Sequence, residues 1–488
     1  YNSSGSQMFE ADDFDLDGTA ITFTSANTGG SKTIDFLHGT VGQIVLEDGS
    51  NLTINSGGAA VTIKPSIAGT TGGTSEDVVI NAGSGTISLD FAGVAIGGGH
   101  IGHVDLTGGT INLNGGITTT STASDGSTTT EIDINGAVIL EANTTITSNG
   151  GNLDFSTTIN SDANTRTLTI TTGGGTVAIG GDIGATSAST DLGALKINES
   201  AGSGAITLSG NIGTTSAFGA STVDIGNAAT TSLSLDGSFY SSDGAQTYIA
   251  DAYSLGGTDP DFASTGDNII FTDGGAATNF VLGNAADLEV STNLGATAGG
   301  NIEFKDNITI KGIQNNAAQD VVLNAGTGTV TVKAIGTSTA EINDVTITGT
   351  GGIFLRGAIT TMAHTVASSE DTGDVTISSA AEITTNNVTI DTSDGSGGSV
   401  DFDSTINSTT GNVALTITSG GGAVAIDNVI GGNADDHLGG LSINASTGTG
   451  TIALAAIGAD AEAGVDGGNV AIGNNTTTLI TLSGADYN

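Results

Sequence analysis

Apolar and polar residues alternate in short runs along the whole chain. Period-two alternation places one set of side chains in a core and the other toward solvent, which is the pattern of a β-strand. Most runs are bounded by Gly, Asn, Asp or Ser, residues that suit turns. Helical patterns are almost absent, and we interpret Ala456–Ala463 as a loop because Gly458 interrupts it. We therefore predict an all-β protein, with strands in runs such as Ala20–Thr24, Asn51–Asn55, Thr86–Asp90, Glu131–Asn135, Thr167–Thr171, Ala205–Ser209, Asn307–Lys311 and Asp344–Thr348.

Two architectures accommodate strands this short: a chain of separate β-sandwich domains and a parallel β-solenoid. Sandwich domains of about 100 residues typically need larger aromatic core residues. Here aromatic residues make up only 4 % of the chain, Trp is absent and Pro occurs twice. A solenoid needs only a thin aliphatic core, because each coil covers the next. The composition favours a parallel β-solenoid, with Gly at its corners in the runs Gly97–Gly99, Gly173–Gly175 and Gly420–Gly422.

The chain also repeats itself over a long period. Asp77–Gly85 returns with two changes as Asp320–Gly328, and Thr169–Ile179 returns as Thr416–Ile426. Self-similarity of this kind indicates an array that acts through its length and surface. We predict two tandem homologous repeats, residues 1–239 and 240–488.

All five tyrosines lie at or near the predicted repeat boundaries: Tyr1, Tyr240, Tyr248, Tyr253 and Tyr487. If Tyr487-Asn488 at the end of the sequence is superposed on Tyr1-Asn2 at its start, the joined sequence nearly matches the one around Tyr240. We therefore expect the repeat to continue beyond both ends. Further copies in a longer polypeptide or head-to-tail stacking of units would each supply it. The chain starts without Met and without a signal peptide, as a processed product or a piece of something longer would. For the tyrosines themselves we favour a wider, better-filled core over a carbohydrate-binding surface.

The charge is strongly negative, with 51 acidic against 8 basic residues and a net charge of −43. This argues against nucleic-acid binding, which needs Lys and Arg to replace phosphate counterions. On a stack of coils about 4.8 Å apart, the charge would approach the line charge of DNA. We expect divalent cations to bind such a stack or to bridge neighbouring ones. Cys is absent, which excludes disulfides and thiolate chemistry, and no run approaches the roughly 20 apolar residues of a membrane span.

The sharpest local motif is Asp13, Asp15 and Asp17, followed by Gly18. Aspartates at positions one, three and five before a Gly match the start of a Ca²⁺-binding loop. The twelfth position, normally Glu, is Thr24, so the match is partial. In a strand the three carboxylates would share one face and repel one another unless a cation were present. We keep two interpretations: a Ca²⁺ site and a solvated acidic edge.

Weaker candidates lie elsewhere. The segments Asp259–Asp261 and Asp435–Asp436 offer paired carboxylates for a cation. His103 and Asp105 alternate onto one face, which suits a transition metal, whereas His100 precedes a Gly turn. Isolated surface histidines are the alternative interpretation.

Parallel β-helices also serve as polysaccharide lyases and hydrolases, which need clustered carboxylates, often with a basic residue or Ca²⁺, in a cleft. No such acid–base group stands out, and we predict that the chain is not an enzyme. Its basic residues are scattered, at Lys32, Lys64, Arg166, Lys196, Lys305, Lys311, Lys333 and Arg356.

Several segments resemble the repeats of very large bacterial surface proteins, the filamentous-haemagglutinin-like adhesins and related β-strand-repeat proteins. They are Leu153–Asn160, Thr176–Gly181, Ile206–Gly213 and Gly244–Tyr248. The resemblance implies a right-handed parallel β-helix shaft, an extracellular or cell-surface location, and adhesion or matrix roles. The secretion domain of that family is not found in this sequence.

Two functions are consistent with these features. The first is a structural building unit of an extracellular bacterial filament or surface array, acting as a rigid acidic rod. The second is the stalk of a large secreted adhesin whose binding tip lies outside this segment. Both predict self-association, head to tail or lateral, together with divalent cations, and the second adds cell-surface or matrix glycans as partners.

Overall fold

The computed structural model describes residues 1–25, 32–38, 42–70, 76–120, 130–184, 191–214, 218–275, 277–283, 286–294, 298–305, 307–313, 319–340, 342–362, 372–384, 386–394, 397–409, 413–432, 437–458, 464–465 and 468–487. Every regular element in these ranges is a β-strand, as predicted. The described chain accordingly offers no helix with the length and hydrophobicity of a membrane span.

The chain divides into two compact units. Unit 1 comprises Tyr1–Ser242 with Tyr248–Ala250, and unit 2 comprises Asp243–Thr247 with Asp251–Asn488. The division lies close to the predicted repeat boundary between residues 239 and 240. The homology of the two repeats stays a prediction.

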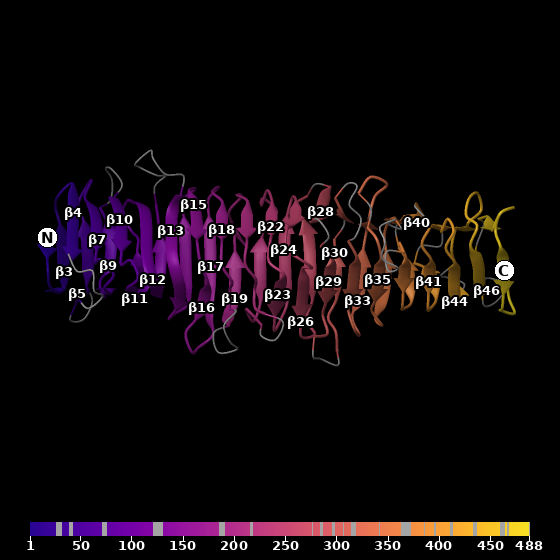
Figure 1. The fold of residues 1–488 in the computed structure, drawn as a ribbon, viewed down its shortest axis with the longest axis horizontal. Coiled ribbons are helices and arrows are strands. Elements are labelled where there is room, and N and C mark those ends of the chain that lie inside the picture. The colour runs from indigo at the N-terminus through magenta and orange to yellow at the C-terminus, as the bar shows by residue number, and fades with distance from the viewer. Residues whose placement is uncertain are drawn as a thin grey trace. The chain divides into compact units, whose positions relative to one another are not determined.

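In unit 1, strands pair in parallel with strands of the next coil, and most partners lie two or three strands away in sequence; β12 is the exception, since it pairs with both of its sequence neighbours. The strands lie side by side along the unit (Figure 1). One such column runs through β1 (Asn2–Ser3), β4 (Ala20–Ser25), β7 (Asn51–Asn55), β10 (Glu76–Asn81), β12 (Ile101–Thr118), β13 (Thr130–Leu140), β15 (Asn152–Phe155), β18 (Val177–Ile179), β20 (Ile206–Leu208) and β22 (Leu233–Leu235).

Unit 2 is built in the same way. One column runs through β26 (Asp261–Ser264), β29 (Leu288–Ser291), β32 (Val321–Asn324), β35 (Val345–Thr348), β38 (Val375–Ile377), β41 (Val400–Phe402), β44 (Val424–Ile430), β46 (Thr451–Ile457) and β48 (Leu479–Leu482), all parallel. Long-range parallel pairing between successive coils is the signature of a solenoid, so the predicted parallel β-solenoid is confirmed.

The core consists of stacked aliphatic side chains. Leu52, Val78 and Val104 occupy the same register position in three successive coils, and none is exposed. Many strands show the buried–intermediate–buried pattern that the sequence alternation predicts, such as β8 (Val61–Ile63) and β20. Burial of these side chains contributes about 25 cal/mol per Å² of apolar surface. Among the tyrosines, Tyr240, Tyr248 and Tyr253 are fully buried.

A buried asparagine closes an equivalent corner in each unit. Asn198 has a left-handed backbone (φ 50°), and its Oδ1 accepts a hydrogen bond from the backbone N of Thr172 at 2.8 Å. Asn444 (φ 49°) accepts the corresponding bond from Ser419 N at 2.8 Å. Asn tolerates the left-handed region better than most residues, because its short polar side chain bonds locally. The corner therefore needs both the conformation and the amide.

The same turn of unit 2 also holds a column of glycines: Ser419 and Gly422 lie between β43 (Ala414–Thr418) and β44, and Asn444 and Gly450 lie between β45 (Gly440–Ile443) and β46. A Cβ on Gly422 would collide with the carbonyl oxygen of Gly398 in the coil before it, and a Cβ on Gly450 would collide with the carbonyl oxygen of Gly422. Only glycine lets the backbones approach this closely. These residues confirm the prediction that glycine occupies coil corners.

The predicted loop over Ala456–Ala463 was wrong at its first two residues. Strand β46 extends to Ile457, and Ala456 and Ile457 pair with Val429 and Ile430 of the preceding coil. The stacking partner, rather than local composition, decides their conformation. The strand ends where Gly458 turns with φ 77°, and residues 459–463 lie outside the described ranges.

Candidate cation-binding sites

The three aspartates of the predicted Ca²⁺ motif lie at one edge of unit 1. Strand β3 (Asp13–Leu16) exposes Asp13 and Asp15, turns Phe14 and Leu16 partly inward, and is followed by exposed Asp17. The three carboxylates thus share one face, as the alternation predicts. Gln43 N donates to Asp13 Oδ1 at 3.2 Å, which ties the first carboxylate to the next coil.

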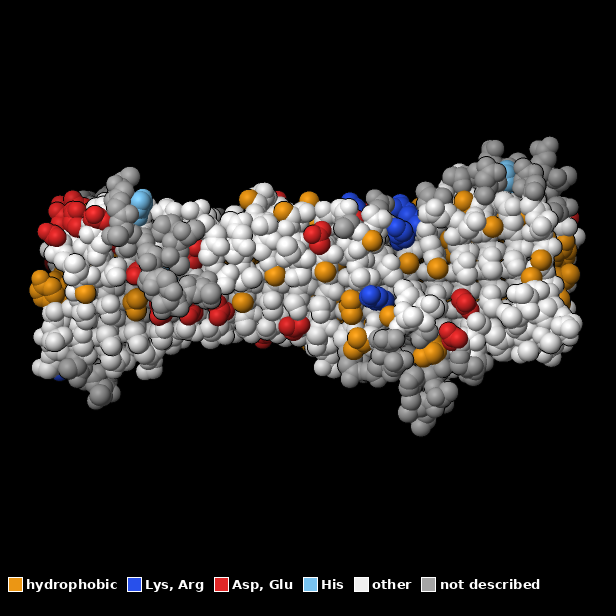
Figure 2. Space-filling model, turned by 90° about the horizontal axis from the view of Figure 1, so that it is seen from above, with side chains coloured by type: hydrophobic (Ala, Val, Ile, Leu, Met, Phe, Trp, Pro, Cys, Tyr) orange, Lys and Arg blue, Asp and Glu red, His pale blue; other side chains and the backbone are white. Residues whose placement is uncertain are grey.

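Two further acidic residues join this group from the next coil. Strand β6 (Gln43–Leu46) pairs with β3, so that Glu47 and Asp48 follow beside Asp17, and an open hollow is lined by Asp15, Asp17, Glu47 and Asp48. Acidic side chains gather at the left end of Figure 2, where unit 1 begins. Sequence reasoning missed Glu47 and Asp48 because they lie about one coil away along the chain.

Thr24, the twelfth position of the predicted loop, does not contribute to this hollow. It lies in β4 and pairs with Asn2 and Asn55 in the neighbouring coils. The arrangement is therefore a stacked acidic face and not a closed Ca²⁺ loop. Its oxygen ligands still have the chemistry that hard divalent cations prefer.

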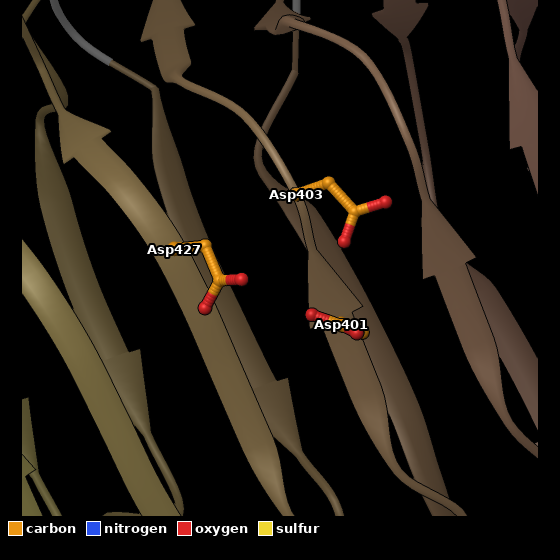
Figure 3. Close-up of side chains that lie close together, drawn as sticks. All are labelled: Asp401, Asp403 and Asp427. Carbon is orange, nitrogen blue, oxygen red and sulfur yellow. The ribbon is translucent and has the colours of Figure 1, made fainter.

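A second acidic group lies in unit 2. The carboxylates of Asp401, Asp403 and Asp427 each place an oxygen within 4.8 Å of the others (Figure 3). Asp401 and Asp403 project from β41 and its end, and Asp427 comes from β44 of the next coil. Burial, followed by the charges of Asp403 and Asp427, raises the pKa of Asp401.

The matching position in unit 1 lacks this group. Phe155 pairs with Ile179 as Phe402 pairs with Ile426, which puts Ser156 and Gly180 where unit 2 has Asp403 and Asp427. The Asp401 group is thus particular to unit 2, and its sequence signal, an Asp-Phe-Asp run, was short and easily overlooked.

The histidine candidate lies in a row of carboxylates. His103 and Asp105 share a face of β12, and Asp105 is directly opposite Asp133, which is opposite Asp154. Burial raises the pKa of Asp133, with Asp105 and Asp154 adding to the rise and His103 opposing it. His100 lies in a turn before this strand.

Of the remaining candidates, Asp261 is directly opposite Glu289 in the parallel pair β26–β29. Burial, with the charge of Glu289 added, raises the pKa of Asp261 to about 6. Asp259 precedes this strand, and its Oδ1 accepts a hydrogen bond from Asp287 N at 3.3 Å. The candidate pair Asp435–Asp436 lies outside the described residues.

Basic side chains neutralise few of these carboxylates. Arg166 pairs with Asp162 at 2.8 Å, and its hydrogen bond lowers the pKa of Asp162 to about 2. Lys196 pairs with Glu199 and Asp224, and Lys305 pairs with Glu303. Asp15, Asp17 and Glu47 in unit 1, and Asp401, Asp403 and Asp427 in unit 2, form no ion pair with a basic residue in the described ranges, so their charge is available to cations in solution.

Comparison of the chain with protein-family models, with curated proteins and with solved structures finds no match.

Proposed function

We propose that the chain is a structural building unit of an extracellular bacterial filament or surface array, in which it acts as a rigid acidic rod. The solenoid is compatible with this role, because stability in such a fold accumulates coil by coil and no single pocket is needed. The observation that carries the proposal is the last coil of unit 2.

That coil exposes the apolar side chains that earlier coils bury. Ile480 is 40 % and Leu482 is 52 % exposed, whereas Ile452 and Leu454, at the same register positions one coil earlier, are at most 1 % exposed. Hydrophobic side chains also gather at the right end of Figure 2, beside this coil. A further solenoid coil would bury them and pair with the open strand edge, which is a ready template for another strand. That coil can come from the same polypeptide or from another copy, and in the proposal stacking of copies end to end makes a filament.

The proposal is tested by sedimentation and electron microscopy of the full chain. We expect concentration-dependent end-to-end association, abolished by Ile480→Lys with Leu482→Lys because two charges would enter the stacking face. Thr481→Lys, on the outward side of the same strand, is the matched control and should leave association intact. Particles that stay single at every concentration, or equal association of both variants, would contradict the proposal.

Divalent cations belong to the same proposal as lateral partners. The acidic faces at Asp15 and Asp401 would attract Ca²⁺ between neighbouring filaments. Lateral bundling should therefore appear with Ca²⁺ and disappear with a chelator, and bundling insensitive to both would rule out this role for the cation.

A further inference from the structure

Five aspartates are stacked in a single column of unit 2. They directly precede, or in one case lie two residues before, strands of five successive coils: Asp259, Asp287, Asp320, Asp344 and Asp374. The Oδ1 of each accepts a hydrogen bond from a backbone N in the next coil. For Asp259, Asp287, Asp320 and Asp344 the donor is the next aspartate of the column, at 3.3, 2.8, 3.0 and 2.6 Å, and for Asp374 it is Ser399 N at 2.6 Å. We call this column the aspartate ladder.

The ladder holds like charges close together. Its members repeat once per coil, about 4.8 Å apart, where two unit charges repel by roughly 1 kcal/mol in water and by more where the surroundings are less polar. Asp320 and Asp344 form no ion pair with a basic residue among the described side chains. Within the same ranges, hydrogen bonds to these two carboxylates go to Oδ1, which leaves both Oδ2 atoms as acceptors.

A buried amide beside this pair supplies an independent sign of a ligand. Asn343 is 1 % exposed, and its Nδ2 donates to Asp320 Oδ1 at 2.8 Å. This places its amide group against the ladder, while Asn343 Oδ1 receives no donor from the described residues. Gln319, stacked beneath it and fully buried, also has an Oε1 without a donor there. A buried acceptor without a partner costs about 1–3 kcal/mol, so two of them on adjoining coils indicate a missing positive or donor group.

We infer that Asp320, Asn343 and Asp344 bind a hard divalent cation, Ca²⁺ in the first instance. The Oδ2 atoms of the two aspartates supply charge, and the amide oxygen of Asn343 supplies a neutral ligand. Carboxylate and amide oxygens are the ligand set that Ca²⁺ takes in proteins, with water completing its six to eight positions. The cation would offset the ladder repulsion and satisfy the amide oxygen together. This site lies within unit 2 and does not depend on the filament proposal.

Calorimetric titration of the full chain with Ca²⁺ in 150 mM salt (about physiological ionic strength) tests the site, on a fraction shown to be single by sedimentation. The double variant Asp320→Asn with Asp344→Asn keeps the Oδ1 acceptors of the ladder and should lose one binding event. Asp401→Asn with Asp403→Asn removes the same charge elsewhere in unit 2 and should retain that event. Asn343→Ala changes no charge and should weaken it about tenfold, the scale on which loss of a supporting polar group weakens metal sites.

Two results would overturn the inference. One is that the wild-type protein and the ladder double variant bind Ca²⁺ in the same number of events, at concentrations up to the millimolar range of extracellular sites. The other is that Asn343→Ala binds like wild type, since the cation would then be held only by diffuse charge. Circular dichroism of each variant confirms that the β-structure is retained. Neither result bears on end-to-end association, which is measured without Ca²⁺.

Discussion

The two units place different chemistry on the same strand pair. In unit 1, β4 and β7 bring Thr22 directly opposite Thr53. In unit 2, β26 and β29 bring Asp261 opposite Glu289. The pairs occupy matching places, because Gln7 donates to Thr24 O and Gln246 donates to Ala263 O at 2.7 Å beside them. One solenoid position therefore accepts either neutral hydroxyls or two carboxylates.

At the matching position of the aspartate ladder, unit 1 again has a neutral residue where unit 2 has a carboxylate. In unit 1, Asn51 Oδ1 accepts a hydrogen bond from the backbone N of Asp77 at 2.9 Å. In unit 2, Asp287 Oδ1 accepts a hydrogen bond from the backbone N of Asp320 at 2.8 Å. The hydrogen bond is the same, but only one acceptor is charged. The fold needs a hydrogen-bond acceptor oxygen at these positions, and either an amide or a carboxylate supplies it. Folding therefore does not explain why unit 2 has a charged acceptor there. This is the basis for assigning a role in binding to the charge.

The largest expected effect concerns a feature that the units share. Replacing Asn198 or Asn444 by Ala leaves the backbone N of Thr172 or Ser419 without its buried partner and forces Ala into a left-handed backbone. We expect each change to lower the free energy of unfolding by about 2–3 kcal/mol. Equilibrium denaturation with hydrogen exchange would measure it in each unit.

Replacement of the same asparagines by Gly separates the two causes, since Gly adopts φ near 50° without strain. The Gly variants should be more stable than the Ala variants. A large loss in only one unit would show that the corners are not equivalent and would weaken the comparison between units.

An intermediate effect is expected from pH. The pKa of Asp261 is raised to about 6 by burial and by Glu289, so the folded state holds this proton more tightly than the unfolded chain does. The stabilisation is therefore complete below about pH 4, the unfolded value, and is lost as pH rises through about 6. Allowing for the partial exposure of Asp261, we expect its protonation to raise the free energy of unfolding by about 1–2 kcal/mol when the pH is lowered from 7.5 to 5.

Thermal unfolding across this pH range at fixed ionic strength measures the effect. Asp261→Thr, which installs the residue of unit 1, should make the pH profile shallower and raise stability at pH 7.5. Part of the profile should remain, because burial also raises the pKa of Asp344 to about 6. The conservative control Thr22→Ser should leave the profile unchanged. If the Asp261→Thr variant kept the full pH dependence of stability, that dependence would come from other carboxylates.

The smallest effect is expected from exchanging the two ladder acceptors. Asp287→Asn keeps the hydrogen bond to Asp320 N and removes one charge, so it should raise stability by about 0.5 kcal/mol without Ca²⁺. Asn51→Asp places a charge beside Asp77 and should lower stability by a similar amount. Both differences should shrink in 1 M salt, where the Debye length is about 3 Å. Unequal responses to salt would show that more than charge distinguishes the units.

The sequence predicted the fold well because solenoid strands carry their alternation locally. Runs such as Asn51–Asn55 need no distant partner to be recognised, and the scarcity of aromatic residues favours a thin stacked core. The loop prediction at Ala456 was wrong because a run of small residues takes its conformation from the coil beneath it.

The candidate sites were harder to predict, since their members meet across coils. The shared face of Asp13, Asp15 and Asp17 followed from spacing alone, whereas Glu47 and Asp48 come from the next turn of the chain. A signal for the ladder was present, in an Asp directly before Val in the runs that start at Asp320, Asp344 and Asp374. It becomes informative only once the strand register places these residues above one another.

The glycine column at Gly398, Gly422 and Gly450 has a consequence for how this protein can vary. Any missense change there adds at least a Cβ against a carbonyl of the adjoining coil, so substitutions at these corners should be eliminated by selection. Outward strand positions, where Thr and Asp replace each other between the units, are free to drift. Homologous proteins would then keep the spacing of their corner glycines long after their surface residues had diverged. The spacing of these glycines, rather than overall sequence identity, is therefore the feature by which relatives of this chain would be recognised.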